Sequence, residues 1–159
     1  MKEKGVNVTI SGSFKYKTEI DNIHREFSRL GALVLGPSLG WDYHPHILIS
    51  RFNNPSFRPL PSEIDLTPRQ IEDSFLSAIA QSQMLYIVTG SEGYVGSSVC
   101  LEAGFALARG LNLYAGHPLD FSLDPDPLWK KCLSEVKILS PEEALTDYKS
   151  LHQSPLLRP

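Results

Sequence analysis

Short apolar runs alternate with helix-forming segments along this chain, and that alternation most narrows what it can fold into. Five runs have the length and apolar character of buried strands: residues 6–10, 32–35, 84–88, 111–115 and 136–139. Between them, apolar residues recur at spacings of three and four, or capping residues such as Thr, Ser and Pro begin a new segment. Helices are therefore predicted at 16–30, from 67, at 97–109, at 128–133 and from 140.

Strands that alternate with helices form parallel sheets, because each helix returns the chain to the edge where the next strand starts. We therefore predict a single α/β domain over residues 1–159. The expected architecture is a doubly wound, flavodoxin/Rossmann-like sheet of five parallel strands in the order 2-1-3-4-5, with helices on both faces. In that order a ligand binds between strands one and three, at their carboxyl ends.

One segment, at about 39–66, lacks any clean periodicity and is rich in proline and aromatic residues. A piece of it, residues 46–50, could add a short strand. Long irregular loops inside small domains often act as lids over a site. An insertion that packs only on its own aromatic side chains explains the composition equally well, so both interpretations stay open.

The charge and composition exclude several classes of function. The formal net charge is −3, so the chain lacks the basic character of a nucleic-acid-binding protein. No apolar run reaches the ~18 residues that span a bilayer, and the first residues lack the apolar core of a signal peptide. A cytoplasmic protein with neither a nucleic-acid nor a membrane partner is expected.

The sequence gives little indication of a metal or a cofactor. Cys100 and Cys132 have no metal-binding spacing and are expected to be reduced packing residues. His44 and His46 could share one strand face, but no third ligand lies nearby in the sequence. We therefore expect neither a bound metal nor a cofactor.

Two unusual loops are expected to meet at the ligand-binding edge of the sheet. One follows the first strand, where a tight turn at 11–13 is predicted, and the other joins the third strand to a helix that Ser97 or Ser98 is expected to cap. Glycines allow close backbone approach, and free amides at a helix start favour anions or hydroxyl groups. The predicted substrate-binding residues of these loops are Ser11, Gly12, Ser13, Phe14, Gly93, Tyr94, Gly96, Ser97 and Ser98.

Glu102 is the candidate catalytic residue. It lies about one turn into a helix that is apolar almost all round, which predicts that the helix is buried. A buried carboxylate needs a partner or a chemical role. A Glu that faces the surface, or that bonds a neighbouring loop, is the alternative interpretation.

Three short motifs together resemble the nucleoside 2-deoxyribosyltransferase family and its nucleotide N-glycosidase relatives, over about residues 6–115. They are Ile10-Ser11-Gly12-Ser13-Phe14, then Ala78-Ile79-x-x-Ser82 before an apolar strand, then a glycine six residues ahead of Glu102-x-Gly104-x-Ala106. The resemblance implies that Glu102 is a nucleophile. It would attack the anomeric carbon of a nucleoside or nucleoside 5′-monophosphate and release the base, and then another base or water would take the sugar. It also implies that Ser97 and Ser98, as a pair, help hold the sugar or its phosphate.

The sequence also departs from the family pattern. The first strand has Thr9 and Ile10 where transferases usually have a tyrosine. Transferases also usually have an aspartate a few residues before the nucleophile, where this chain has Gly96-Ser97-Ser98. Asp73 is the nearest match to the family's base-binding aspartate, although the best register places Phe75 there. These differences favour hydrolysis, or ligand binding without turnover, over transfer. A non-catalytic nucleotide or nucleotide-sugar binding module is therefore the alternative function.

Two further expectations concern the acid and the assembly. No residue is assigned as the acid that protonates the leaving base. Asp42, Asp65, Glu72 and Asp73 are each interpreted as solvated or capping carboxylates. Family members commonly form dimers or tetramers, so the resemblance implies a homo-oligomer whose small-molecule partner is a nucleoside or nucleotide.

Overall fold

The computed structural model of the chain describes residues 5–35, 68–120 and 133–152. The predicted insertion at 39–66, its possible strand and most of the helix predicted at 128–133 lie outside these residues. So do Asp42, His44, His46, Asp65 and Cys132, and the side chain of Phe14. None of the described helices has the length and apolar character needed to cross a bilayer.

A single sheet of five parallel strands forms the centre of the described structure, in the order β2-β1-β3-β4-β5. The strands are β1 (Asn7–Gly12), β2 (Leu33–Leu35), β3 (Met84–Val88), β4 (Asn112–Ala115) and β5 (Lys137–Ile138). The predicted fold class and strand order are confirmed. The first strand runs two residues past its predicted end, so Ser11 and Gly12 pair with Ile87 and Val88 of β3 rather than forming a turn.

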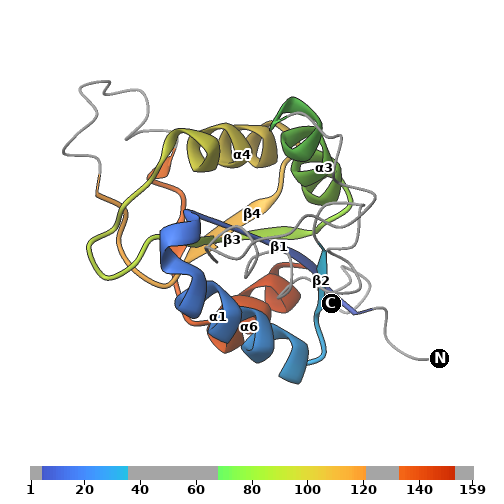
Figure 1. Cartoon of the computed structure of the whole chain (residues 1–159). Coiled ribbons are helices and arrows are strands. Elements are labelled where there is room, and N and C mark those ends of the chain that lie inside the picture. Colours follow the sequence, from blue (N-terminus) through green and yellow to red (C-terminus); the bar gives the residue numbers. More distant parts are fainter. Residues whose placement is uncertain (1–4, 36–67, 121–132, 153–159) are drawn as a thin grey trace.

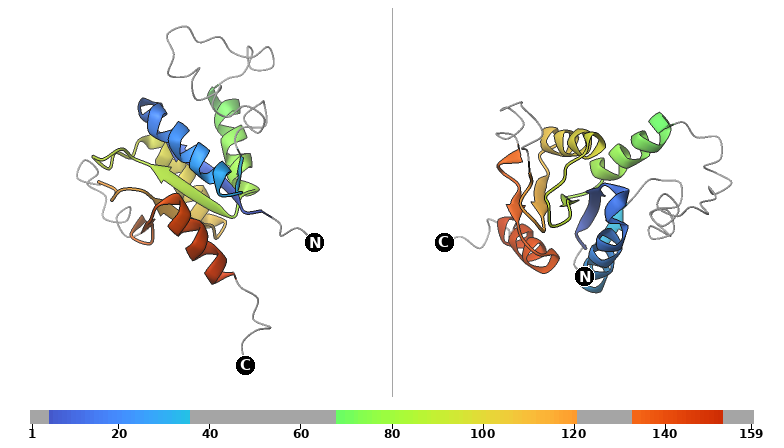
Figure 2. Two further views of the ribbon diagram at one scale, coloured as in Figure 1. Left: turned by 90° about the horizontal axis from the view of Figure 1, so that it is seen from below. Right: turned by 60° about the vertical axis from the view of Figure 1, so that its left-hand side comes forward.

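Helices cover both faces of this sheet. On one face lie α1 (Lys17–Arg29) and α6 (Pro141–Leu151), and on the other lie α3 (Pro68–Ala80) and α4 (Ser97–Ala108) (Figure 1). A short 3-10 helix, η1 (Phe14–Tyr16), connects β1 to α1. Figure 2 shows the same layers from two other directions, with α3 and α4 packed side by side.

Side chains of the central strand alternate between two hydrophobic cores. Met84, Tyr86 and Val88 pack on the α1 and α6 side, whereas Leu85 and Ile87 pack on the α3 and α4 side. Successive side chains of a strand point to opposite faces, so every residue of β3 is buried. This continuous burial explains why the third strand reads as an unbroken apolar run in the sequence.

Two predictions about helix α4 are wrong. Its N-cap is Gly96, without a side-chain cap, so Ser97 and Ser98 form the first turn instead. The helix is also not buried all round, since Leu101 is 53% exposed. Its buried residues are Val99, Glu102, Ala103 and Ala106, at the three- and four-residue spacing of a single helix face.

Candidate functional site

The site begins with Ser11, near the carboxyl end of β1. Because side chains alternate along a strand, Val8 and Ile10 enter the core beside α1, while Thr9 and Ser11 face α3 and α4. Thr9 Oγ1 lies 2.7 Å from Ser82 Oγ, at the end of α3. Ser11 is fully buried, and its hydroxyl donates a hydrogen bond to Glu102 Oε2. The strand therefore aims a hydroxyl at the predicted nucleophile.

Glu102 is delivered to the same place by the buried face of α4. Its side chain is only 5% exposed, which contradicts the interpretation of Glu102 as a surface residue. It shares that face with Val99, Ala103 and Ala106, which pack against the sheet. The small side chains of these alanines let α4 lie close to β1 and β3. The Glu102 carboxyl group can therefore reach Ser11 on β1.

A second carboxyl group, that of Glu72, meets Glu102 from α3. The two side chains lie within hydrogen-bonding reach, and each shifts the pKa of the other. Glu72 Oε1 is buried and has no hydrogen-bond partner among the residues that the structure describes. Two ionised carboxylates can only accept hydrogen bonds, whereas one shared proton supplies the missing donor. The pair is therefore best satisfied with one proton between the two groups.

The surroundings strongly favour the protonated form of Glu102. Burial is the largest cause, and the charge and hydrogen bond of Glu72 act in the same direction, while the Ser11 hydroxyl opposes them. Together they raise the pKa of Glu102 to about 8. Burial and the nearby charge of Asp73 also raise the pKa of Glu72, against the lowering effect of its contact with Glu102.

Glu72 is a member of the candidate site that the sequence interpretation missed. It was grouped with solvated carboxylates, but it belongs to the inward face of α3. A signal was present, because Phe75, Leu76 and Ile79 follow it at spacings of three, four and seven residues. An acid on the apolar stripe of a helix has the same anomaly that singled out Glu102.

Asp73, the predicted base-binding residue, does not join the site. Its side chain is 53% exposed and pairs with Arg69 at 3.0 Å, one turn earlier on α3. This is an ordinary ion pair between residues four apart on a helix surface. The structure thus replaces Asp73 by its neighbour Glu72 as the carboxylate of α3 that faces the site.

The two predicted loops do meet at the carboxyl ends of β1 and β3. Tyr16, just after the first loop, donates a hydrogen bond to Glu92 in the second, and its ring centroid lies 6.3 Å from that of Tyr94. Ser13 turns the chain by accepting a hydrogen bond from the Tyr16 amide at its carbonyl oxygen. The convergence expected from the strand order is confirmed for these residues.

Gly93 holds the second loop against the segment that follows β4. It has a φ of +77°, and a Cβ there would lie 2.4 Å from the carbonyl oxygen of Pro118. Only glycine tolerates both the left-handed backbone and this close approach. Its carbonyl accepts a hydrogen bond of 2.8 Å from the Asp120 amide. Gly93 therefore shapes the loop and has no space for a ligand on that side.

Ser97 and Ser98 are exposed on the first turn of α4, beyond Gly96. Backbone amides at the start of a helix lack partners within the helix and can bind an anion or a hydroxyl group. Among the described residues, no group of three side chains could hold a metal ion.

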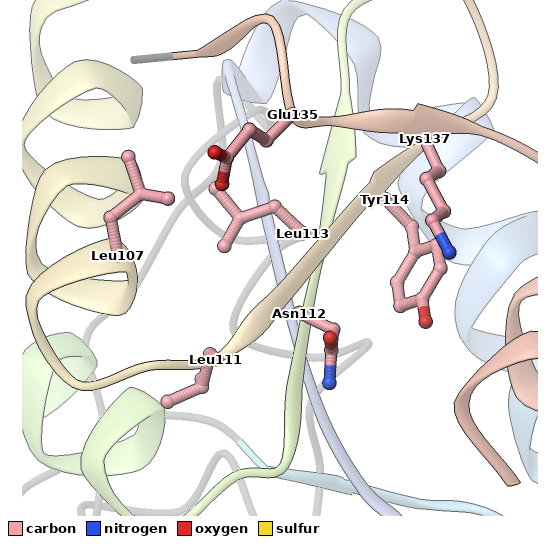
Figure 3. A pocket seen from close by; sticks show the side chains of 7 residues that line it. All are labelled: Leu107, Leu111, Asn112, Leu113, Tyr114, Glu135 and Lys137. Carbon is pink, nitrogen blue, oxygen red and sulfur yellow. The ribbon is translucent and has the colours of Figure 1, made fainter. Parts of the chain in front are cut away.

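The hollow drawn in Figure 3 lies elsewhere, beside the amino-terminal half of β4, and measures about 80 Å³. Leu107 of α4 lies on one side of the strand with Leu113, while Tyr114 and Lys137 lie on the other. The remaining lining residues are Leu111, Asn112 and Glu135. The hollow contains neither Glu72 nor Glu102.

Comparison with known proteins gave no match, either to a protein-family model or to a curated protein sequence. The resemblance to nucleoside 2-deoxyribosyltransferases therefore stays a prediction from the motifs.

Proposed function

We propose that the protein hydrolyses the N-glycosidic bond of a nucleoside or nucleoside 5′-monophosphate, with Glu102 as the nucleophile. The observation that carries the proposal is the contact between buried Glu102 and half-buried Glu72 beside Ser11, at the edge where this sheet topology binds ligands. A carboxyl group that is buried beside a second one destabilises a fold at neutral pH, so the presence of Glu102 here is best explained by chemistry.

In the first step, the pair provides one carboxylate and one proton. The shared proton first passes from Glu102 to Glu72. An oxygen of the resulting Glu102 carboxylate then forms a bond to the anomeric carbon while the bond from that carbon to the base nitrogen breaks. The base leaves with the electron pair of that bond and takes the shared proton from Glu72. The product is a glycosyl ester on Glu102 and a neutral base.

In the second step, Glu72 acts as a base. Water attacks the anomeric carbon, the ester bond to Glu102 breaks, and the proton of the water passes to Glu72. The free sugar leaves, and the pair again holds one proton. The net reaction consumes one nucleoside and one water molecule and yields one sugar and one base.

The direct contact between the two carboxyl groups favours this double displacement. Enzymes that invert the anomeric carbon separate their carboxyl groups by roughly 6.5–9.5 Å to admit a water molecule, whereas retaining enzymes keep them near about 5 Å. In the free protein, Glu72 and Glu102 are within hydrogen-bonding reach of each other. A small separation on substrate binding gives the retaining arrangement, with the reaction centre beside Glu102.

The rest of the site supports a sugar or sugar-phosphate ligand. The first turn of α4, with Ser97 and Ser98 exposed, offers backbone amides and hydroxyl groups. No cofactor is required by the proposed reaction. Assembly into a homo-oligomer and a cytoplasmic location also remain proposals, and sedimentation of the purified protein would test the first.

A binding module without turnover is the second candidate. The observation that favours it is the pKa of about 8 for Glu102, because a protonated carboxyl group donates a hydrogen bond well but is a poor nucleophile. In this case Glu102 would recognise an acceptor atom of a nucleotide. Binding would then survive, with no product formed.

Incubation with ribo- and deoxyribonucleosides and their 5′-monophosphates tests the proposal, with free base followed by chromatography. Glu102→Gln should abolish base release, and Glu72→Gln should lower it by roughly 10²–10⁴-fold. Glu26→Gln is the matched control, because Glu26 forms an exposed ion pair with Arg29 on α1. Mass spectrometry of the acid-quenched reaction should show a sugar adduct on the wild type that Glu102→Gln lacks. Ligand-induced thermal shifts without base release would instead support the binding module.

A further inference from the structure

Four side chains connect the two loops that follow β1 and β3, and we call Lys15, Tyr16, Glu92 and Tyr94 the loop clamp. Tyr16 donates a hydrogen bond to Glu92, and the Lys15 Nζ lies 3.8 Å from the same carboxylate oxygen. The Lys15 Nζ also lies 3.6 Å from the centroid of the Tyr94 ring and 5.0 Å from that of Tyr16. A single ammonium group thus contacts a carboxylate and two aromatic rings.

Two glycines, Gly90 and Gly96, leave space for the aromatic side chains of the loop clamp. Gly90, which follows β3, has a φ of +65°, and a Cβ there would lie 2.4 Å from the ring of Tyr16. The Tyr16 ring therefore rests directly on the backbone of the second loop. A Cβ on Gly96, the N-cap of α4, would lie 3.3 Å from the Tyr94 hydroxyl oxygen. The clamp thus spans from the start of α1 to the start of α4.

Each side of the loop clamp continues into one member of the site. Tyr16 ends η1, which follows Ser11 and Gly12 after a single residue, so the first loop sets the end of β1. Tyr94 precedes α4, which delivers Glu102 from its second turn. Ser11 and Glu102 bond each other across the gap between these two connections.

We propose that the loop clamp positions Ser11 and Glu102 for the hydrolysis by holding the β1–α1 and β3–α4 connections together. Its members are positioning residues, and this inference rests on the function proposed above. Because Lys15 and Glu92 are 50% and 60% exposed, their contacts add little to global stability. Their effect is local: the clamp keeps the two loops together and water away from the buried carboxyl group of Glu102.

The test uses two variants. Tyr16→Phe removes only the hydroxyl group that donates a hydrogen bond to Glu92, and Glu92→Gln removes the negative charge beside Lys15. Tyr148→Phe, on α6, is the matched control. The first readout is the titration of Glu102 by NMR in protein labelled with ¹³C at the glutamate carboxyl carbons, assigned with Glu102→Gln. The groups that face Glu102 are Ser11 and Glu72, and none of the clamp variants changes them.

Loss of the clamp should admit water and lower the pKa of Glu102 by about one unit or more in both variants, with thermal midpoints near that of the wild type. The second readout is hydrolysis, where kcat should fall about tenfold with little change in KM, because misplaced reacting groups slow the chemical step. A Glu102 titration that matches the wild type in both variants overturns the inference. Absence of base release from every nucleoside overturns the proposed function instead, and the NMR titration still decides the effect of the clamp.

Discussion

Replacing Glu102 by Gln should stabilise the protein at and above neutral pH, even though it removes the proposed nucleophile. The folded protein raises the pKa of this carboxyl group from 4.5 to about 8, mainly through burial. The folded state therefore holds a proton that the unfolded state releases above pH ~4.5. The stability that this bound proton gives to the folded state is complete below pH ~4.5 and is lost as the pH rises from there to the folded-state pKa of about 8.

The size of the effect follows from the two pKa values. Each unit of difference is worth about 1.4 kcal/mol, so the wild type should lose about 3–5 kcal/mol between pH 4.5 and pH 8. A Gln at this position does not titrate, and its carbonyl oxygen can still accept the hydrogen bond of Ser11. The free energies of unfolding of the two proteins should thus be most alike near pH 4.5 and diverge as pH rises.

Urea unfolding followed by circular dichroism at pH 5, 6, 7 and 8 measures this divergence. With an m-value of about 2 kcal/mol/M, the wild-type midpoint should fall relative to that of Glu102→Gln by about 0.7 M urea per pH unit. Comparison of the two proteins cancels the titration of the histidines, which both contain. Glu26→Gln, an exposed glutamate on α1, should follow the wild type at every pH.

A constant difference between the wild-type and Glu102→Gln midpoints across this range would refute the reasoning. It would mean that the Glu102 carboxyl group is solvated or stably paired as an anion. The proton shared with Glu72 would then be absent, and the proposed acid would have no proton to give.

Three further changes test other parts of the structure. Ser140→Ala removes the capping box of α6, in which the Ser140 hydroxyl accepts from the Glu143 amide, and should cost about 1 kcal/mol, read as a thermal midpoint lower by about 2–4 °C. Asp147→Asn removes a carboxylate whose pKa is lowered by hydrogen bonds from Lys137 and Tyr114. The wild type should lose the stability that this ionised carboxylate provides as the pH falls below 3.8. Acid-unfolding curves of the variant should lack this loss. Ser11→Ala removes a donor that favours the ionised form of its carboxylate partner, so the alkaline-side pKa in the pH profile of base release should rise, and an unchanged profile would contradict the hydrogen bond seen here.

Much of the fold was predictable because its signals are local. The apolar run at 84–88 coincides with β3, and the Ser140-Pro141-Glu142-Glu143 segment forms the capping box that its residue types indicate. The strand order also followed, because right-handed connections between parallel strands leave few arrangements for this sequence of elements. The helix predicted at 16–30 agrees with α1 to within a residue at each end.

The start of α4 shows where local signals fail. Serines are good N-caps, so either Ser97 or Ser98 was expected to cap the helix. The backbone instead enters the helix one residue earlier, at Gly96, where Tyr94 packs against the N-cap. Gly96 has the extended backbone of an N-cap without any side-chain cap, and residue preference alone does not predict such a start.

By itself, the sequence determined most of the elements, because they depend on periodicity along one segment, and their parallel order, because few arrangements fit the alternation. It singled out Glu102 as a carboxylate in an apolar helix but left open whether that side chain is buried. Only the tertiary structure decided that Glu72 is its partner and that Asp73 is not. Those two residues are neighbours on α3, and which of them faces Glu102 depends on the rotation of α3 about its axis as it packs against α4. The packing of α3 and α4 against each other and against the sheet sets that rotation. The choice of Glu72 over Asp73 therefore depends on tertiary contacts that the sequence of α3 alone does not contain.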